Sequence, residues 1–172
     1  MEATGGELIQ LTFFEHAWTE SPAWSPDGQR IAFISTQNGP PRVWTIGANG
    51  GVPKAIANTD ASDAAGKVSW WPGSDIVYQQ SRMRNFLRID TRTQEEIPLI
   101  PQGESVGTLF PHKPVFSPDG KKMAFFWNQK RKGLWMISLN PYAETFLLPG
   151  IINPFGWSPD GKYVYAIRSG TV

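Results

Sequence analysis

Short apolar runs recur along this chain of 172 residues, each bounded by polar and turn-forming residues. They are Ile31-Ala32-Phe33-Ile34, Ile76-Val77-Tyr78, Met123-Ala124-Phe125-Phe126 and Val164-Tyr165-Ala166-Ile167. Successive side chains of a strand point to opposite faces, so a run that is apolar at every position predicts a strand buried on both sides. Sheets stacked face to face bury strands in this way. No segment predicts a helix, and we therefore expect an all-β protein.

The same turn motif precedes each apolar run. Trp-Ser-Pro-Asp-Gly at 24–28 returns at 157–161, with Phe in place of Trp at 116–120 and as a degraded copy, Trp-Trp-Pro-Gly-Ser, at 70–74. Proline favours extended geometry in the residue before it, and Ser-Pro-Asp-Gly suits a type I turn. The prolines at 26, 72, 118 and 159 place the copies 46, 46 and 41 residues apart. This regular spacing indicates a repeat architecture.

The repeats divide a single domain, residues 1–172, into units of about four strands. We expect complete units at 21–58, 67–100 and 112–149 and a partial unit at 153–172. Residues 6–12 are expected to form the outer strand of a preceding unit. The turn of the second unit has lost its Asp-Gly pair, so it is expected to be less regular.

These features together resemble the TolB-type β-propeller repeat: an aromatic residue, Ser-Pro-Asp-Gly, an Ile-Ala-Phe-like run and an aromatic-rich third strand. The resemblance covers nearly the whole chain. It implies four-stranded antiparallel blades around a central channel, with about three complete blades plus partial ones at both ends, as in a fragment of a larger propeller. It also implies recognition of a protein or peptide at a channel mouth, typically in the periplasm or elsewhere outside the cytoplasm of a bacterium.

Composition narrows the classes of function. The formal net charge is +1 with no charge run, which gives no indication of nucleic-acid binding. Cysteine is absent, so disulfides and thiolate metal sites are excluded. No apolar run approaches the length of a membrane span, and no signal peptide is visible at the start of the sequence. We expect no membrane insertion.

Candidate binding residues lie in the segments that lead into the first strand of a unit. His16 and His112, which titrate near neutrality, both precede such strands, and such loops would border a channel mouth and could grip a peptide or a small polar ligand. The interpretation that we favour for these positions is ordinary solvated loop residues, with ligand binding as the alternative. The full candidate set is Glu15, His16, Trp18, Glu20, His112 and Lys113.

Catalytic chemistry finds no support in the sequence. There is no Gly-x-Ser-x-Gly elbow and no glycine-rich phosphate loop. Asp27, Asp119 and Asp160 suggest a metal site, but they belong to separate units, and an aspartate commonly satisfies its own turn. In the sialidase-type Asp box the glycine stands at a different distance from the aspartate, so the sequence does not favour a sialidase. We expect no catalytic residue, no cofactor and no metal site.

Three functional hypotheses follow. The first is a non-catalytic scaffold for protein or peptide recognition. The second is the non-catalytic propeller of a prolyl-oligopeptidase-like serine peptidase, which would require an α/β-hydrolase domain beyond these residues. The third is the sensor portion of a larger receptor, such as a bacterial Ser/Thr kinase. The sequence of the flanking gene would distinguish them.

Tryptophans recur at matched strand positions, which predicts that they are core residues rather than ligand platforms; they are Trp24, Trp44, Trp70, Trp135 and Trp157.

A stack of repeats also needs something to cover its end units. Either residues 8–12 join the fourth unit within one chain, or a second copy covers the open edges and faces. We favour self-association.

Overall fold

The computed structural model describes residues 8–56, 68–73, 75–80, 85–101, 111–128 and 131–169. All regular structure in these residues is β-strand, which confirms the all-β prediction. In chain order the strands are β1 (Thr19–Trp24), β2 (Arg30–Ser35), β3 (Arg42–Gly47), β4 (Gly50–Ala55), β5 (Val68–Trp70), β6 (Ile76–Gln80), β7 (Asn85–Ile89), β8 (Glu96–Pro98), β9 (His112–Phe116), β10 (Lys122–Trp127), β11 (Gly133–Leu139), β12 (Tyr142–Pro149), β13 (Ile152–Trp157) and β14 (Val164–Arg168).

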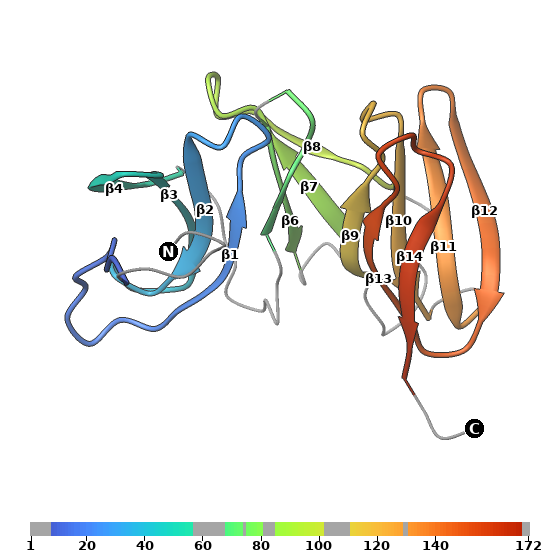
Figure 1. Cartoon of the computed structure of the whole chain (residues 1–172), viewed down its shortest axis with the longest axis horizontal. Helices are drawn as coiled ribbons and strands as arrows, with labels where there is room; N and C mark the ends of the chain where they lie inside the picture. The colour runs from blue at the N-terminus through green and yellow to red at the C-terminus, as the bar shows by residue number, and fades with distance from the viewer. Residues whose placement is uncertain are drawn as a thin grey trace.

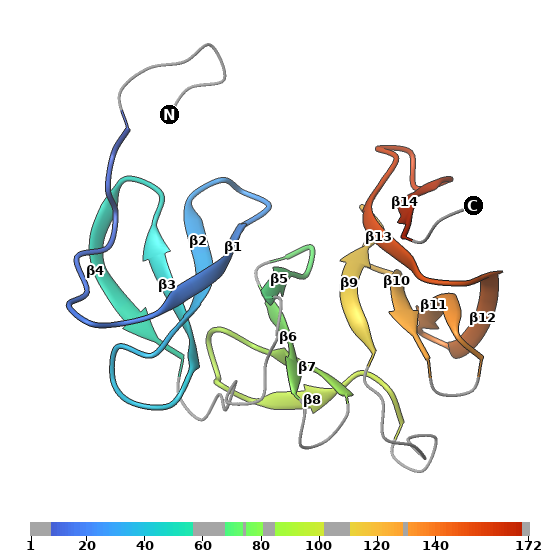
Figure 2. The ribbon, with the colours of Figure 1, turned by 90° about the horizontal axis from the view of Figure 1, so that it is seen from below.

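The strands form three four-stranded sheets, β1–β4, β5–β8 and β9–β12, followed by the pair β13–β14. Within each sheet every strand pairs with the next strand of the chain in antiparallel fashion. The sheets stand side by side along an arc (Figures 1 and 2). The first strands β1, β5, β9 and β13 lie on the concave side of this arc, and β4, β8 and β12 lie on its outer side. We keep the unit boundaries 21–58, 67–100, 112–149 and 153–172 as a proposal.

Side chains of the second strand point alternately to its two faces, and those of β2 and β10 pack against neighbouring parts of the molecule on both faces. In β2, Ala32 is fully buried and packs toward β5–β8, whereas Phe33 packs on the opposite face. In β10, Ala124 packs toward β13–β14 and Phe125 toward β5–β8. Burial on both faces, predicted from the runs, is therefore present in β2 and β10.

A tryptophan at the end of the first strand joins one sheet to the sheet before it. Trp70 donates its indole N–H to the backbone carbonyl of Ala23, at 2.8 Å. Trp157 donates in the same way to the carbonyl of Val115, at 3.0 Å. Ala23 and Val115 are equivalent, because each is the residue before its own motif aromatic. We call this contact the tryptophan joint.

Trp24 corrects one prediction. It occupies the same motif position in the first sheet, but its side chain is 61% exposed. A motif tryptophan is buried by the sheet that precedes its own, and no sheet precedes β1–β4 among the described residues. Trp44, Trp70 and Trp135 are buried as predicted, and Trp157 is partly buried.

The outer strand predicted at 6–12 is a second correction: residues 8–12 form no strand, and residues 6 and 7 lie outside the described part of the chain. A strand needs a neighbour for its backbone hydrogen bonds, and these residues are paired with none of the described strands. Instead the segment crosses the face of the first sheet that points away from the second (Figure 2). Leu11 and Phe14 pack there against the buried side chains of β2 and β3, with the Phe14 ring 5.4 Å from that of Trp44.

Candidate functional site

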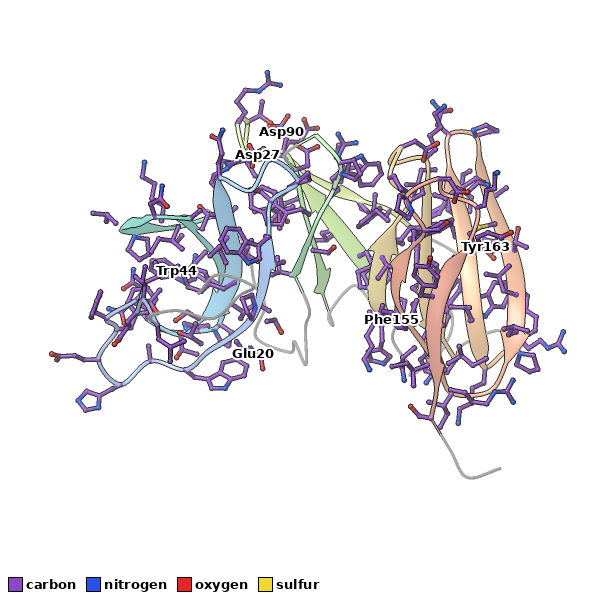
Figure 3. All side chains as sticks on the ribbon, in the orientation of Figure 1. Glu20, Asp27, Trp44, Asp90, Phe155 and Tyr163 are labelled. Atoms are coloured by element: carbon purple, nitrogen blue, oxygen red, sulfur yellow. The ribbon has the colours of Figure 1, made fainter. Side chains whose placement is uncertain are left out.

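The first strand of each sheet runs between two ends of the molecule. It begins at the end that holds the candidate binding residues and leads to the motif turn at the other. In Figure 3, Glu20 lies toward one end of the molecule and Asp27 at the opposite end, beside Asp90. We call the first the mouth end and the second the turn end.

The turn end is built from three copies of one hydrogen-bonded turn. In the first copy, the Ser25 hydroxyl donates to Asp27 Oδ1 at 2.6 Å, and the backbone N–H of Gln29 donates to the same oxygen at 3.0 Å. The backbone N–H of Arg30 donates to Ser25 Oγ at 2.9 Å, and Gly28 takes a left-handed φ of 68°. The copies at 117–122 and 158–163 repeat these contacts.

These contacts set the protonation state of the turn carboxylates. In each turn the serine hydroxyl, followed by the backbone N–H two residues after the aspartate, holds the aspartate pKa below its ordinary value; this applies to Asp27, Asp119 and Asp160. Hydrogen bonds to the charged form favour that form. Each carboxylate is therefore engaged in its own turn, as the sequence predicted. Among the described residues, no three His, Asp or Glu side chains gather to hold a metal ion.

The mouth end carries one polar residue at the same register position on three first strands. Each of these residues stands four places before its motif aromatic and pairs with an apolar residue near the end of the second strand. The pairs are Glu20 with Ile34, His112 with Phe126 and Asn153 with Ile167. Asn153 was missed by the sequence reasoning, although its spacing from Trp157 matches that of Glu20 from Trp24.

A β-bulge follows each of these polar residues. The register of β1 shifts between Glu20 and Ala23, and similar shifts occur in β9 and β13. Ser21 and Lys113 occupy the equivalent bulge position with a left-handed φ of 55°. Non-glycine residues seldom adopt this conformation, and bulges are frequent beside binding sites because they re-aim side chains.

His112 is half-buried at the mouth end. Its ring stacks on Phe126 with centroids 6.2 Å apart and planes at 20°. Burial, followed by the positive charge of Lys113, lowers the pKa of His112 from its ordinary value. The neutral imidazole is therefore the form present at pH 7, and it can both donate and accept a hydrogen bond.

The remaining candidates lie along the segment that enters β1. Trp18 is 47% exposed, while its backbone is fixed by hydrogen bonds to Thr36: its N–H donates to Thr36 Oγ1 at 2.9 Å, and its carbonyl accepts from the Thr36 N–H at 3.0 Å. Glu15 and His16 are exposed. This segment and the start of β9 belong to sheets separated by β5–β8. They are separate parts of one end of the molecule and do not form a single cluster.

Antiparallel four-stranded sheets set around an axis, with the first strand of each innermost, define a β-propeller. The family model of the TolB beta propeller domain matches residues 1–159. The chain belongs to this family.

Solved structures share the fold. TolB from Acinetobacter baumannii has a TM-score of 0.73 and 23% identity over 87% of this chain and 38% of its own. A TolB-type structure from Agrobacterium tumefaciens has a TM-score of 0.64 and 18% identity over 82% of this chain and 50% of its own. Puromycin hydrolase has a TM-score of 0.58 and 11% identity over 83% of this chain and 23% of its own.

These identities establish the fold alone, and this chain spans no more than half the length of any of these three structures. A search of curated proteins gives no match. The described residues contain no helix long and apolar enough to cross a membrane.

Proposed function

We propose that this domain is a non-catalytic propeller scaffold that recognises a protein or peptide partner at its mouth end. The observation that carries this proposal is the repeated polar position Glu20, His112 and Asn153. Each residue stands beside a bulge in a first strand of the arc. A rigid scaffold that presents different side chains at one repeated position is suited to reading a ligand that spans several blades.

The chemistry of the mouth end suits a peptide with one bulky apolar side chain and several polar groups. Trp18 offers an exposed indole on a backbone held in place by Thr36, and aromatic anchors of this kind contribute much of the energy in protein recognition. Glu20 supplies a carboxylate and Lys113 an ammonium group. His112 lies at the same end, with its ring stacked on Phe126. Membership of the TolB family supports a bacterial protein that acts in the periplasm or elsewhere outside the cytoplasm.

Support for a non-catalytic role comes from how the nucleophile and acid–base candidates are used. The turn serines donate to the turn aspartates, at the opposite end of the first strands from His112. Nucleophilic catalysis by serine needs a base within hydrogen-bond reach. The turn Ser–Asp pairs are explained by the turns themselves.

A second candidate function is the non-catalytic propeller of a longer peptidase. Puromycin hydrolase favours it, because the likeness covers 83% of this chain but 23% of the hydrolase chain, whose remaining length lies outside the shared propeller region. The sensor portion of a receptor such as a bacterial Ser/Thr kinase remains a further form of the scaffold hypothesis. An α/β-hydrolase domain encoded beside these residues would favour the peptidase assignment.

Selection of a displayed random-peptide library on the purified domain tests the scaffold proposal. We expect a selected peptide to bind the wild-type domain and to bind Trp18→Ala about 30-fold more weakly, the typical effect of removing an aromatic hot spot. Lys113→Glu is expected to weaken binding of acidic peptides. Fluorescence anisotropy with each purified variant measures both effects.

Lys54→Glu is the matched control for this experiment, because Lys54 is an exposed lysine on β4, at the outer side of the arc. It should bind the selected peptide as the wild type does. Equal affinity for the wild type, Trp18→Ala and Lys113→Glu would show that peptides bind elsewhere and would reject the mouth end as the site.

A further inference from the structure

We propose that a cleft between the second and third sheets binds a small organic acid, that is, a carboxylate carried on an apolar body. The cleft lies at the turn end of the molecule, which Asp27 and Asp90 mark in Figure 3. Its lining comes from the second motif turn, β7 and β8 on one side and from the third motif turn and the β11–β12 turn on the other. Both walls belong to complete four-stranded sheets in the middle of the arc.

The cleft owes its character to a departure from the repeat. In the three intact motif turns, the serine after the aromatic residue is buried and bonds within its own turn, as Ser117 does to Asp119. The second turn has Trp71 at this position. Its backbone N–H still closes the turn by donating to the Asp75 carbonyl at 2.8 Å. The indole has no turn aspartate to bond, and its ring packs 4.9 Å from that of Phe116 in the next sheet.

Gly120 of the third motif turn makes room for this indole. A Cβ at Gly120 would lie 3.1 Å from Trp71 Nε1, whereas a Cβ at the equivalent Gly28 would meet nothing within 4 Å. Trp71 and Gly120 both line the cleft. Trp70 and other buried tryptophans donate their indole N–H to a backbone carbonyl. Within the described part of the chain, the Trp71 N–H has no such acceptor and is not enclosed.

Two cationic side chains line the cleft with Trp71. The Arg88 guanidinium lies 4.8 Å from the centre of the Trp71 ring, and its Nε and Nη2 both contact Asp75 Oδ2 at 2.6 Å, so its charge is balanced. Lys121 is exposed, and its backbone is fixed by the Leu139 N–H, which donates to the Lys121 carbonyl at 3.0 Å. No acidic side chain is among the described residues that line the cleft.

The clefts on either side hold carboxylates next to their cations. Asp75 and Asp90 line the cleft between the first and second motif turns, together with two arginines. Asp119 and Asp160 line the cleft between the third and fourth motif turns, together with Lys122. An anionic ligand would be repelled by these carboxylates, whereas the middle cleft offers it a cation and a free indole donor.

The size of the middle cleft and its apolar wall indicate what carries the anion. Ile97, Leu99 and Leu139 supply apolar lining, and the cleft has a volume of about 400 Å³. Small-molecule sites are typically of roughly 300–1,000 Å³, mostly apolar, with a few placed polar groups. An apolar body would rest on this wall while the carboxylate accepts from the Trp71 N–H and the Lys121 ammonium group. An inorganic anion would leave the wall unused.

Titration of the isotope-labelled domain with phenylpropionate, followed by NMR, tests the proposal. We expect saturable binding and a shift of the Trp71 indole N–H signal, which is assigned by Trp71→Phe. Lys121→Gln should weaken binding about tenfold and Trp71→Phe about fivefold, as expected for loss of one hydrogen bond to a carboxylate. Lys121→Arg keeps the charge and should bind as the wild type does. Phenylpropionamide and acetate, which lack the charge and the apolar body respectively, should each bind at least about tenfold more weakly.

Lys162→Gln is the matched control, because Lys162 holds the place of Lys121 in the fourth motif turn and does not line the cleft. It should bind phenylpropionate as the wild type does. Trp18→Ala should do so too, which makes the result independent of peptide binding at the mouth end. Circular dichroism and thermal melting verify that each variant is folded.

Three results would overturn the proposal. The first is the lack of saturable binding to the wild type up to about 10 mM phenylpropionate, which corresponds to negligible affinity. The second is wild-type affinity in both Lys121→Gln and Trp71→Phe, which would place the bound acid elsewhere. The third is tighter binding of a short peptide with a free C-terminal phenylalanine, lost in Lys121→Gln, which would assign the cleft to peptide termini instead of small acids.

Discussion

Replacing Trp70 with alanine is expected to lower the free energy of unfolding by about 3–5 kcal/mol, the usual cost of truncating a buried tryptophan. The Trp70 side chain is 6% exposed, and its indole donates to the Ala23 carbonyl while Arg30 covers its ring. The substitution would leave a cavity between two sheets and a carbonyl without its donor. Both changes would weaken the packing between the first two sheets.

Trp24→Ala is the matched control, because Trp24 holds the same motif position on an exposed surface. It is expected to change the free energy of unfolding by no more than about 0.5 kcal/mol, as surface substitutions usually do. Urea unfolding followed by circular dichroism measures both variants, at a concentration where the chain is monomeric. Equal losses for the two variants would mean that the sheets are not joined through Trp70 as described.

Gly133→Ala is expected to lower the free energy of unfolding by about 1–3 kcal/mol, the range for overpacking a well-filled site. A Cβ at this position would collide with the Leu148 carbonyl oxygen and would lie 2.7 Å from the Phe146 ring. Both groups belong to β12, which pairs with β11 at Gly133. Relief would require the backbones of β11 and β12 to separate.

Gly156→Ala controls for the general effect of adding a methyl group to a strand glycine. The nearest atom to its Cβ would be a ring carbon of Tyr165 at 4.0 Å, an ordinary contact. The melting temperature of Gly156→Ala should therefore stay near that of the wild type, while that of Gly133→Ala falls by several degrees. An unchanged melting temperature for Gly133→Ala would contradict the described packing of β12 on β11.

Much of the fold could be predicted because its determinants are local. The Ser-Pro-Asp-Gly turns use contacts within six residues, as from Ser25 to Arg30, so each copy specifies its own turn. The apolar runs predict strands buried on both faces; β2 and β10 are buried in this way, whereas Tyr165 and Ile167 of β14 are exposed. Spacing of the turns then indicates stacked repeats.

The errors arose where burial depends on a neighbouring sheet. Trp24 and Trp157 have the same local sequence, but Trp157 packs on a sheet before it, whereas none of the described sheets lies before that of Trp24. Residues 8–12 have a strand-like pattern, but no described strand pairs with them; Leu11 packs on the first sheet, whereas Leu8 and Ile9 are exposed. Local sequence carries no information about whether such a neighbour is present.

The mouth end was predicted as a set of loops. That its polar residues share one position on successive first strands is visible only in the strand register. Glu20 and His112 were selected because they precede the expected first strand of a unit, whereas their equivalence comes from their pairing with the end of the second strand. Counting back four residues from each motif aromatic would have added Asn153. The bulges at Ser21 and Lys113 have no comparable sequence signal.

Exchange of the indole N–H protons, followed by NMR in deuterated water, tests most directly the central claim that motif tryptophans join consecutive sheets. The indole signals of Trp70 and Trp24 are assigned by substituting each residue in turn. The account predicts that the Trp70 proton exchanges about a hundredfold or more slowly than the Trp24 proton, because the Trp70 joint must open first. Equal exchange rates at the two positions would contradict it.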